Sequence, residues 1–293
     1  MHRIAWEQCY LPLARRQDFI LNLCNLGPVW HRNSATLIHD AQVYSAPASY
    51  SLPFRLWYRL QFFFIGKRHR LIFTVSEFSK RELIRYGIAR ADKIVVVHNG
   101  CDHVQHVQPD DTQLAVLGLK PRRYVLALAN TQKHKNIGVL FKTFADASLN
   151  DVDLVLFGGA TKAEFESLGQ ALPPNVRFTG RISDPELVGL MANAGALAFP
   201  SLTEGFGLPP LEAMALGCPV VAAPLGALPE VCGEAALYAD AFDPQAWRAS
   251  ILTVLDDDAV RQTLIAAGRR QASGFTWTRA ARGLFDAVNA LSR

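Results

Sequence analysis

The stretch ALAFPSLTEGFGLPPLEAMALGCPVVAA, residues 196–223, decides the fold of this 293-residue chain. Its first and last parts, ALAFP and PVVAA, are short apolar runs of the kind that form buried strands. The intervening SLTEGFG predicts a loop, and LPPLEAMALG predicts a helix whose prolines suit the first turn. A strand, a helix and a second strand in this order predict two parallel strands joined by a crossover helix.

The same alternation recurs along most of the chain and predicts an α/β protein. Further runs of β-forming residues predict strands at 35–39, 71–75, 94–97, 124–129, 153–159 and 176–180. Helical spacing between these runs predicts helices at 77–87, 137–147 and 185–195.

A polar stretch, HNGCDHVQHVQPDDTQ at 98–113, interrupts the alternation and predicts a linker. We therefore expect a first domain over 1–112 with about three strands, and a second over 113–293 with at least five strand–helix units. The last helix of the second domain is expected to pack back on the first. By its strand count the first domain is expected to be incomplete.

Cysteine usage and hydropathy bear on the compartment. The five cysteines are odd in number and scattered, with no C-x-x-C pair, which favours free thiols in a reducing compartment. No stretch approaches 18 consecutive apolar residues, and the first ten lack the apolar region of a signal peptide. We expect a cytoplasmic protein, either soluble or peripheral on the inner face of the membrane.

Charge is distributed unevenly. Residues 1–100 carry fourteen Lys or Arg and six Asp or Glu, whereas the remainder carries sixteen Lys or Arg and twenty Asp or Glu. The basic part suggests an anionic partner. In LPFRLWYRLQFFFIGKRHR, residues 52–70, cations interleave with aromatic residues, which fits a helix on an anionic membrane surface or an amphipathic core helix with a solvated basic end. Nucleic acid is not expected, because no binding motif accompanies the charge.

Two glutamates in the opening stretch carry chemistry. Glu204 is expected just beyond a strand's carboxyl end and Glu212 in the opening turns of the next helix, where ligands of open parallel sheets bind. Gly205 and Gly207 allow close backbone approach, and a helix N-terminus attracts anions. A nucleotide sugar would offer hydroxyls to the carboxylates and phosphates to the backbone. The alternatives are a helix-dipole role for Glu212 and an ordinary loop acid at Glu204.

Residues 199–244, FPSLTEGFGLPPLEAMALGCPVVAAPLGALPEVCGEAALYADAFDP, resemble the nucleotide-sugar-binding core of the family-4 retaining glycosyltransferases, or glycosyl transferases group 1. Glu204 and Glu212 have the spacing of that family's E-x7-E motif. Further matches are GRISDPELVGLMANAGALAFPS (180–201), TVSEFSKREL (74–83), IVVVHNGCD (94–102) and LIHD (37–40). The resemblance implies the GT-B fold, with two Rossmann-like parallel-sheet domains. This sequence departs from the family in that the opening strand and glycine-rich loop are not found.

Three residues are implied as catalytic by the resemblance. His39, in LIHD, resembles the first-domain histidine that reaches the donor sugar across the cleft, and Glu204 resembles the carboxylate near its anomeric carbon. Lys135, in NTQKHKNIGVLFKTF, resembles the diphosphate-binding lysine. A lysine there would stabilise the charge that grows on the leaving phosphate as the sugar C1–O bond breaks, whereas the alternative is a solvated helix-start residue.

The remaining implied residues bind the donor. Glu212 resembles the carboxylate that holds the ribose hydroxyls, and Phe206, Gly207 and Leu208 would line the diphosphate and sugar. Two further donor contacts are expected from Lys133, which would supply the basic charge often found at position 134, and from Ile182, a neighbour of the base.

The resemblance implies retaining transfer of a hexose, with mannose favoured, from a nucleoside-diphosphate sugar to a glycan or lipid-linked acceptor in bacterial surface polysaccharide synthesis. No cofactor is expected, and no metal, since His98, Asp102, His103 and His106 match no defined metal-site spacing. A short first domain leaves an alternative, a nucleotide-sugar-binding remnant or partner subunit without activity. An oxidoreductase is excluded because no G-x-G-x-x-G follows a strand.

Overall fold

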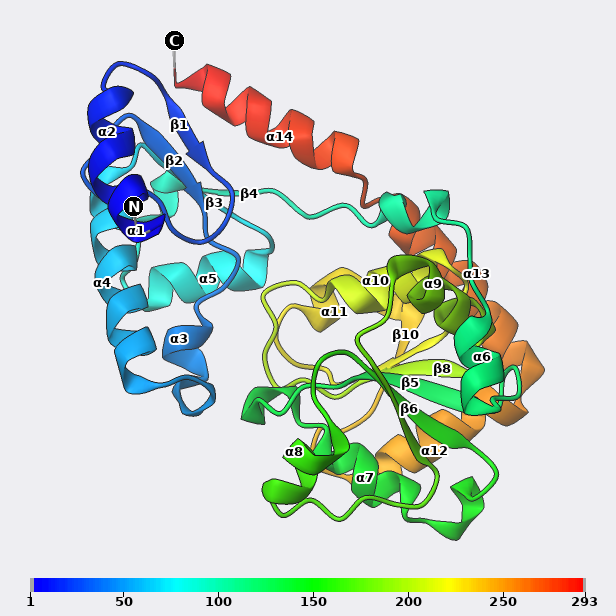
Figure 1. The fold of residues 1–293 in the computed structure, drawn as a ribbon. Helices are drawn as coiled ribbons and strands as arrows, with labels where there is room; N and C mark the ends of the chain where they lie inside the picture. The colour runs from blue at the N-terminus through cyan, green and yellow to red at the C-terminus, as the bar shows by residue number, and fades with distance from the viewer. Residues whose placement is uncertain (1–2, 292–293) are drawn as a thin grey trace. The chain divides into compact units, whose positions relative to one another are not determined.

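The computed structural model describes residues 3–291, and the chain divides into two compact units. Unit 1 comprises Met1–Gly100, Thr203–Phe206 and Trp277–Arg293, and unit 2 comprises Cys101–Leu202 and Gly207–Thr276. Each unit has its own parallel sheet and core, which confirms the α/β prediction (Figure 1).

Unit 1 contains a four-stranded parallel sheet in the order β1-β2-β3-β4. The expectation of about three strands was wrong, because it missed a three-residue edge strand, ILN, which is too short to show a period. The strands are β1 (Ile20–Asn22), β2 (Ser34–Leu37), β3 (Leu71–Thr74) and β4 (Ile94–Val96).

Helices complete unit 1. Helix α4 buries Phe62 and Ile65 in a core with Ile72 of β3 and Leu83 of α5. The last helix, α14, belongs to this unit, where the Arg70 guanidinium donates a hydrogen bond to the carbonyl of Leu291. The helices are α1 (Arg3–Ala5), η1 (Trp6–Tyr10), α2 (Leu11–Ala14), α3 (Gln42–Ser45), η2 (Pro47–Ser49), α4 (Leu52–Arg68), α5 (Glu77–Arg85), η3 (Ala91–Lys93) and α14 (Trp277–Ala290).

Unit 2 contains a six-stranded parallel sheet in the order β10-β9-β8-β5-β6-β7. The chain runs outward from β5 to β7 and then returns to β8 on the other side of β5, so the strand order reverses between β5 and β8. The strands are β5 (Tyr124–Leu128), β6 (Asp153–Phe157), β7 (Val176–Gly180), β8 (Ala196–Phe199), β9 (Val220–Ala222) and β10 (Ala236–Tyr238).

Both faces of this sheet are covered by helices, with α7 and α12 on one face and α9, α10 and α11 on the other (Figure 1). Trp247 of α12 is fully buried, and its indole N–H donates to the carbonyl of Asp240 at 2.9 Å. The helices are η4 (Asp102–His106), α6 (Thr112–Leu117), η5 (Lys133–Lys135), α7 (Gly138–Phe144), η6 (Ala147–Leu149), α8 (Lys162–Ser167), α9 (Asp184–Asn193), α10 (Leu208–Ala215), α11 (Leu228–Cys232), η7 (Gly233–Ala235), α12 (Pro244–Asp256) and α13 (Asp258–Ser273).

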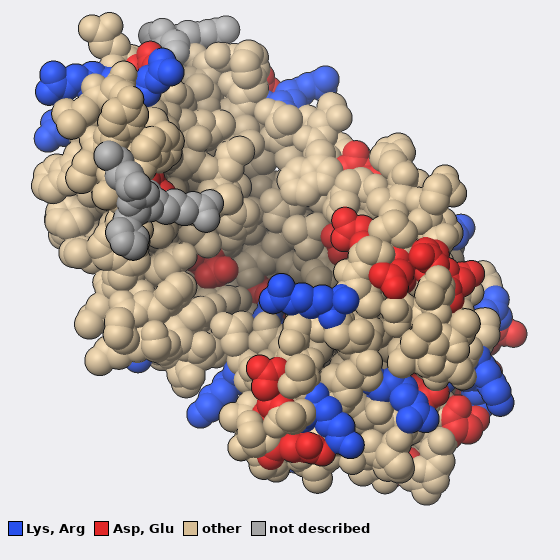
Figure 2. All heavy atoms as spheres, viewed as in Figure 1, with Lys and Arg blue, Asp and Glu red and all other residues tan. Residues whose placement is uncertain are grey.

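Charge and hydropathy vary over the surface. On the face that Figure 2 shows, Lys and Arg are interspersed with Asp and Glu over unit 2. Within residues 3–291, no helix has both the length and the apolar character needed to cross a bilayer.

Candidate active site

The reversal of strand order in unit 2 brings two loops together. β5 and β8 pair in parallel, with Val125 opposite Ala196 and Leu126 opposite Leu197, so their carboxyl ends lie side by side. In open parallel sheets this is the position where ligands bind. The loop after β5 carries Lys135, and the loop after β8 carries Glu204.

The helix that follows β8 begins as the sequence predicted. Gly207 is the N-cap residue of α10 with φ +103°, a conformation that side chains with a Cβ rarely adopt, and prolines occupy the first turn. Phe206 and Gly207 are buried, and Leu208 is half-buried at the first helical position. The backbone of this segment is therefore shaped by glycine and proline together.

Lys135 is held against the end of β8. The carbonyl of His134 accepts a hydrogen bond from the N–H of Leu202 at 2.7 Å, and the Lys135 ammonium lies 6.0 Å from the centre of the Phe199 ring. Lys133 is exposed, whereas Lys135 is half-buried.

Asn136 fixes this lysine loop and was not predicted from the sequence. Its side-chain amide donates to the carbonyls of Pro200 at 3.2 Å and Ala241 at 2.7 Å, and its φ is +55°. Asparagine is the ordinary residue that most readily adopts this left-handed conformation, so an Asn directly after Lys135 was the signal in the sequence.

Glu212 lies in the second turn of α10, and no acidic residue occurs in the first turn. A helix-dipole role is therefore disfavoured, because that effect falls off within the first turn. Its side chain is 16% exposed, and Oε1 lies 3.3 Å from Nε2 of His103 in η4. Burial raises the pKa of the Glu212 carboxyl, His103 opposes the increase, and the negative charge of Asp184 adds to it.

Ile182 lies between β7 and α9 and is half-buried. Asp184, two residues later, influences the pKa of Glu212, so this segment lies near that carboxylate. The other predicted donor residues of unit 2 thus gather at the carboxyl ends of β5 and β8.

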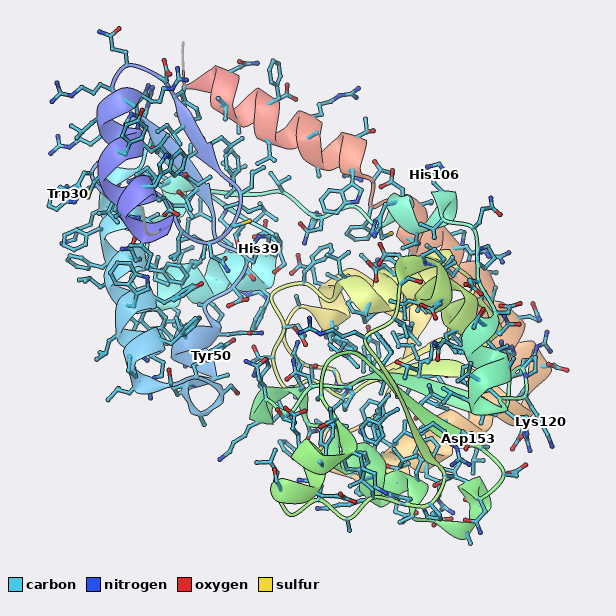
Figure 3. All side chains as sticks on the ribbon, in the orientation of Figure 1. Trp30, His39, Tyr50, His106, Lys120 and Asp153 are labelled. Atoms are coloured by element: carbon cyan, nitrogen blue, oxygen red, sulfur yellow. The ribbon has the colours of Figure 1, made fainter. Side chains whose placement is uncertain are left out.

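Unit 1 contains the remaining predicted residues. His39 follows β2 (Figure 3). Its backbone N–H donates to Asn25 Oδ1 at 2.7 Å, and its ring Nε2 lies 3.2 Å from the carbonyl oxygen of Leu23. The Ser79 hydroxyl lies 3.0 Å from the carbonyl oxygens of both His39 and Gly205. This contact brings His39 together with the loop that carries Glu204.

Loop residues 203–206 have further contacts within unit 1. The Ser76 hydroxyl donates to the Gly205 carbonyl at 2.6 Å, and the amide of Gln42 donates to the Thr203 carbonyl at 3.2 Å. Glu204 itself is 8% exposed, and the Phe206 ring lies 6.1 Å from that of His98.

The linker histidines are separated by the structure. His98 belongs to unit 1 and contacts Phe206, whereas His103 belongs to unit 2 and contacts Glu212. Across residues 3–291, no group of three or more His, Cys, Asp or Glu could hold a metal ion. Independence of metal stays a prediction.

A pocket of about 400 Å³ lies at the opposite end of the unit 2 sheet, lined by residues that include Lys120 and Asp153 (Figure 3). Its Arg177 is paired with Asp153 at 3.2 Å, and its Arg123 with Asp151. These charges neutralise one another, and none of the predicted site residues lines the pocket.

Two family models match the chain. Residues 110–271 match the family model described as glycosyl transferases group 1, and residues 23–105 match the model of glycosyltransferase family 4. The chain belongs to the group 1 glycosyltransferase family. The matched ranges of this glycosyltransferase-family chain contain all nine predicted site residues.

A curated relative of this glycosyltransferase-family chain is O-antigen chain mannosyltransferase B of Escherichia coli, which is 36% identical over 71% of this chain and 57% of its own length. The chain spans between about half and three-fifths of the length of the first three curated relatives it matches, and about 28% of the length of serotype-specific mannosyltransferase WbdA of Escherichia coli.

Solved structures show the GT-B fold. Sucrose-phosphate synthase from Thermosynechococcus elongatus aligns with a TM-score of 0.73 at 23% identity, over 88% of this chain and 67% of its own. Anabaena Alr3699/HepE, crystallised in complex with UDP-glucose, aligns with a TM-score of 0.72 at 22% identity, over 87% of this chain and 72% of its own.

Proposed function

We propose that this protein transfers a hexose from a nucleoside-diphosphate sugar to a glycan or lipid-linked acceptor of a bacterial surface polysaccharide, with retention of anomeric configuration. The observation that supports it most is the junction of two loops at the carboxyl ends of β5 and β8, where Asn136 ties the Lys135 loop to the Pro200 carbonyl. The E. coli relative named for O-antigen mannosyl transfer favours mannose as the sugar.

Each polar group has a separate role in this proposal. Glu212, half-buried on α10, accepts hydrogen bonds from the ribose hydroxyls. Lys135 and the first turn of α10 bind the diphosphate, with Gly207 and Leu208 contributing backbone N–H groups. Glu204 and His39 contact the transferred sugar, Phe206 lines it, and Lys133 and Ile182 complete the donor contacts.

Chemistry follows from where charge develops. As the C1–O bond breaks, the sugar gains oxocarbenium character and negative charge grows on the leaving diphosphate. A fixed ammonium and helix N-terminus stabilise that charge more in the transition state than in the ground state. The acceptor oxygen then bonds to C1 on the face that the leaving phosphate departs from, and that phosphate takes the proton of the acceptor hydroxyl. Because the new bond forms on the face where the old one breaks, the anomeric configuration is retained. No step needs a metal or cofactor.

A donor panel tests the proposal. The protein is mixed with GDP-mannose, UDP-glucose and related nucleotide sugars, with lipid extracts as acceptors, and thermal stabilisation and nucleotide release are measured. Stabilisation with acceptor-dependent release, and an NMR spectrum of a product with the donor's anomeric configuration, are expected. Stabilisation without release from any donor would instead favour a nucleotide-binding partner subunit. Absence of both stabilisation and release with every donor would contradict the proposal.

Peripheral contact of unit 1 with an anionic membrane is part of the proposal. Helix α4 exposes Leu52, Leu56, Leu60 and Phe63, which fall on one helical face and are 45–60% exposed. Lys67 continues this face, with its ammonium 4.1 Å from the centre of the Phe63 ring. An apolar stripe with a basic end is typical of a helix that lies in a membrane interface.

Vesicle sedimentation tests this contact. Wild-type protein is expected to bind vesicles of phosphatidylglycerol and phosphatidylcholine, and Leu56→Gln/Leu60→Gln to bind several-fold less. Arg59 is left unchanged, because it donates to the Val43 carbonyl and stacks on Tyr44, so its loss would disturb folding. Equal sedimentation of both proteins would contradict membrane contact through α4.

A further inference from the structure

One histidine outside the predicted site contacts a predicted ligand-binding carboxylate. Glu212 Oε1 lies 3.3 Å from His103 Nε2, which donates the hydrogen bond. The pair is asymmetric, since the Glu212 side chain is 16% exposed and that of His103 is 46% exposed. A mostly buried carboxylate is thus held through one oxygen by a more exposed imidazole.

The neighbours of His103 on both sides in the sequence fix its backbone. The N–H of Cys101 donates to the carbonyl of Phe275 at 3.0 Å, and Cys101 is 1% exposed. Val104 is also buried, and η4 packs against α10. With buried residues immediately before and after Asp102 and His103, the imidazole can reach Glu212 without a large loss of side-chain freedom.

The charges around Glu212 indicate what its hydrogen bond with His103 does. Burial and the negative charge of Asp184 both raise the pKa of the Glu212 carboxyl, and His103 lowers it. A hydrogen bond to one carboxylate oxygen also fixes the rotation of the carboxylate plane, so the other oxygen faces a constant direction. A carboxylate that is ionised and oriented is what two neighbouring hydroxyls of a ribose would require.

We propose that His103 is a positioning residue, which holds Glu212 so that its carboxylate selects nucleotides with a ribose 2′-hydroxyl over their 2′-deoxy counterparts. The inference rests on the proposed function, since it takes Glu212 as the ribose ligand. It adds a residue from η4, immediately after the boundary between the two units, to the selection of the donor.

Nucleotide titration separates this role from a structural one. Dissociation constants for GDP, 2′-deoxy-GDP, UDP and 2′-deoxy-UDP are measured by calorimetry for wild type, Glu212→Gln, His103→Ala, His103→Gln and His106→Ala. For whichever ribonucleotide binds, His103→Ala is expected to weaken binding about tenfold while leaving its deoxy form nearly unchanged. His103→Gln, which keeps an N–H donor, is expected to restore most of the discrimination.

His106→Ala is the matched control, because His106 lies on the same short helix and is exposed. It should behave as wild type. If Glu212→Gln abolishes discrimination and His103→Ala retains it, the positioning role is wrong and the proposed function stands. If wild type binds neither ribonucleotide, or Glu212→Gln keeps full discrimination, the ribose role of Glu212 is wrong and the inference falls with it.

Discussion

The hydroxyl of Ser76 lies 2.6 Å from the carbonyl oxygen of Gly205, 129 positions further along the chain. The Ser79 hydroxyl reaches the same oxygen at 3.0 Å. Two serines at the start of α5 therefore hold the loop that carries Glu204. The motif TVSEFSKREL, noted in the sequence as a family match, thus has a physical role in fixing the backbone next to a proposed catalytic residue.

Loss of the shared Ser79 hydroxyl should lower turnover more than donor affinity. Ser79→Ala leaves the Ser76 cap of α5 intact, because that cap uses the backbone N–H of residue 79. We expect a several-fold lower kcat, a nearly unchanged donor KM and a stability loss of about 1 kcal/mol. Steady-state kinetics and urea unfolding measure these quantities. A wild-type kcat would contradict the positioning of Glu204 by this serine.

Gly205→Ala should be more damaging. An added Cβ would clash with the carbonyl of His39 and lie 2.9 Å from Cβ of Asp40, so the loop would have to move. We expect about 2 kcal/mol of destabilisation and loss of most turnover. Gly159→Ala is the control, because its Cβ would meet only the Arg181 side chain at 3.4 Å or more. Equal melting temperatures for the two variants would argue against the close approach.

Asn136→Asp should detach the Lys135 loop. Aspartate tolerates the left-handed backbone but cannot donate to the carbonyls of Pro200 and Ala241. We expect turnover to fall about tenfold, with nucleotide-diphosphate affinity falling in parallel. Lys142→Ala, on a helix of the same unit, serves as a control for loss of a cation at a distance. Unchanged diphosphate affinity in Asn136→Asp would show that Lys135 needs no such support.

His69 should make unit 1 sensitive to acid. The residue is fully buried, its Nδ1 lies 2.8 Å from the Thr36 hydroxyl and its Nε2 lies 3.2 Å from the Pro28 carbonyl oxygen. Burial lowers the pKa of His69 to about 4 from 6.5. Below 6.5 the unfolded chain therefore binds a proton that the folded chain does not.

The resulting stability is full above pH 6.5 and decreases as the pH falls toward 4, by up to about 3 kcal/mol. Urea unfolding of wild type and His69→Gln at pH 7.5, 5.5 and 4.5 measures it. Carboxylates titrate in both proteins, so the difference between the two plots of unfolding free energy against pH reports the titration of His69. Parallel plots would show that this imidazole is not buried in its neutral form.

The sequence predicted the apolar strands inside each sheet well and the three-residue strands β1 and β10 at the sheet edges poorly. All eight predicted strands occur, because each has a run of β-forming residues. Strands β1 and β10 were missed, since three residues at a sheet edge carry no period. The α10 start was predictable because Gly207 and the prolines act locally.

Contacts between distant segments could not be predicted in this way. His103 was considered with His98 and His106 as one cluster, whereas its partner is Glu212, more than a hundred positions away. Likewise, nothing near Gly205 indicated that serines 76 and 79 hold its carbonyl. Such pairs depend on how strands are ordered in the sheets, which a single sequence does not specify.

The division of roles between the two glutamates is the centre of this account. Nucleotide release from the best donor, measured as kcat and KM for wild type, Glu204→Ala and Glu212→Ala, tests it most directly. We predict that Glu212→Ala raises the donor KM with kcat largely kept, and that Glu204→Ala lowers kcat with KM largely kept. Wild-type kinetic constants in both variants would contradict the assignment of this site.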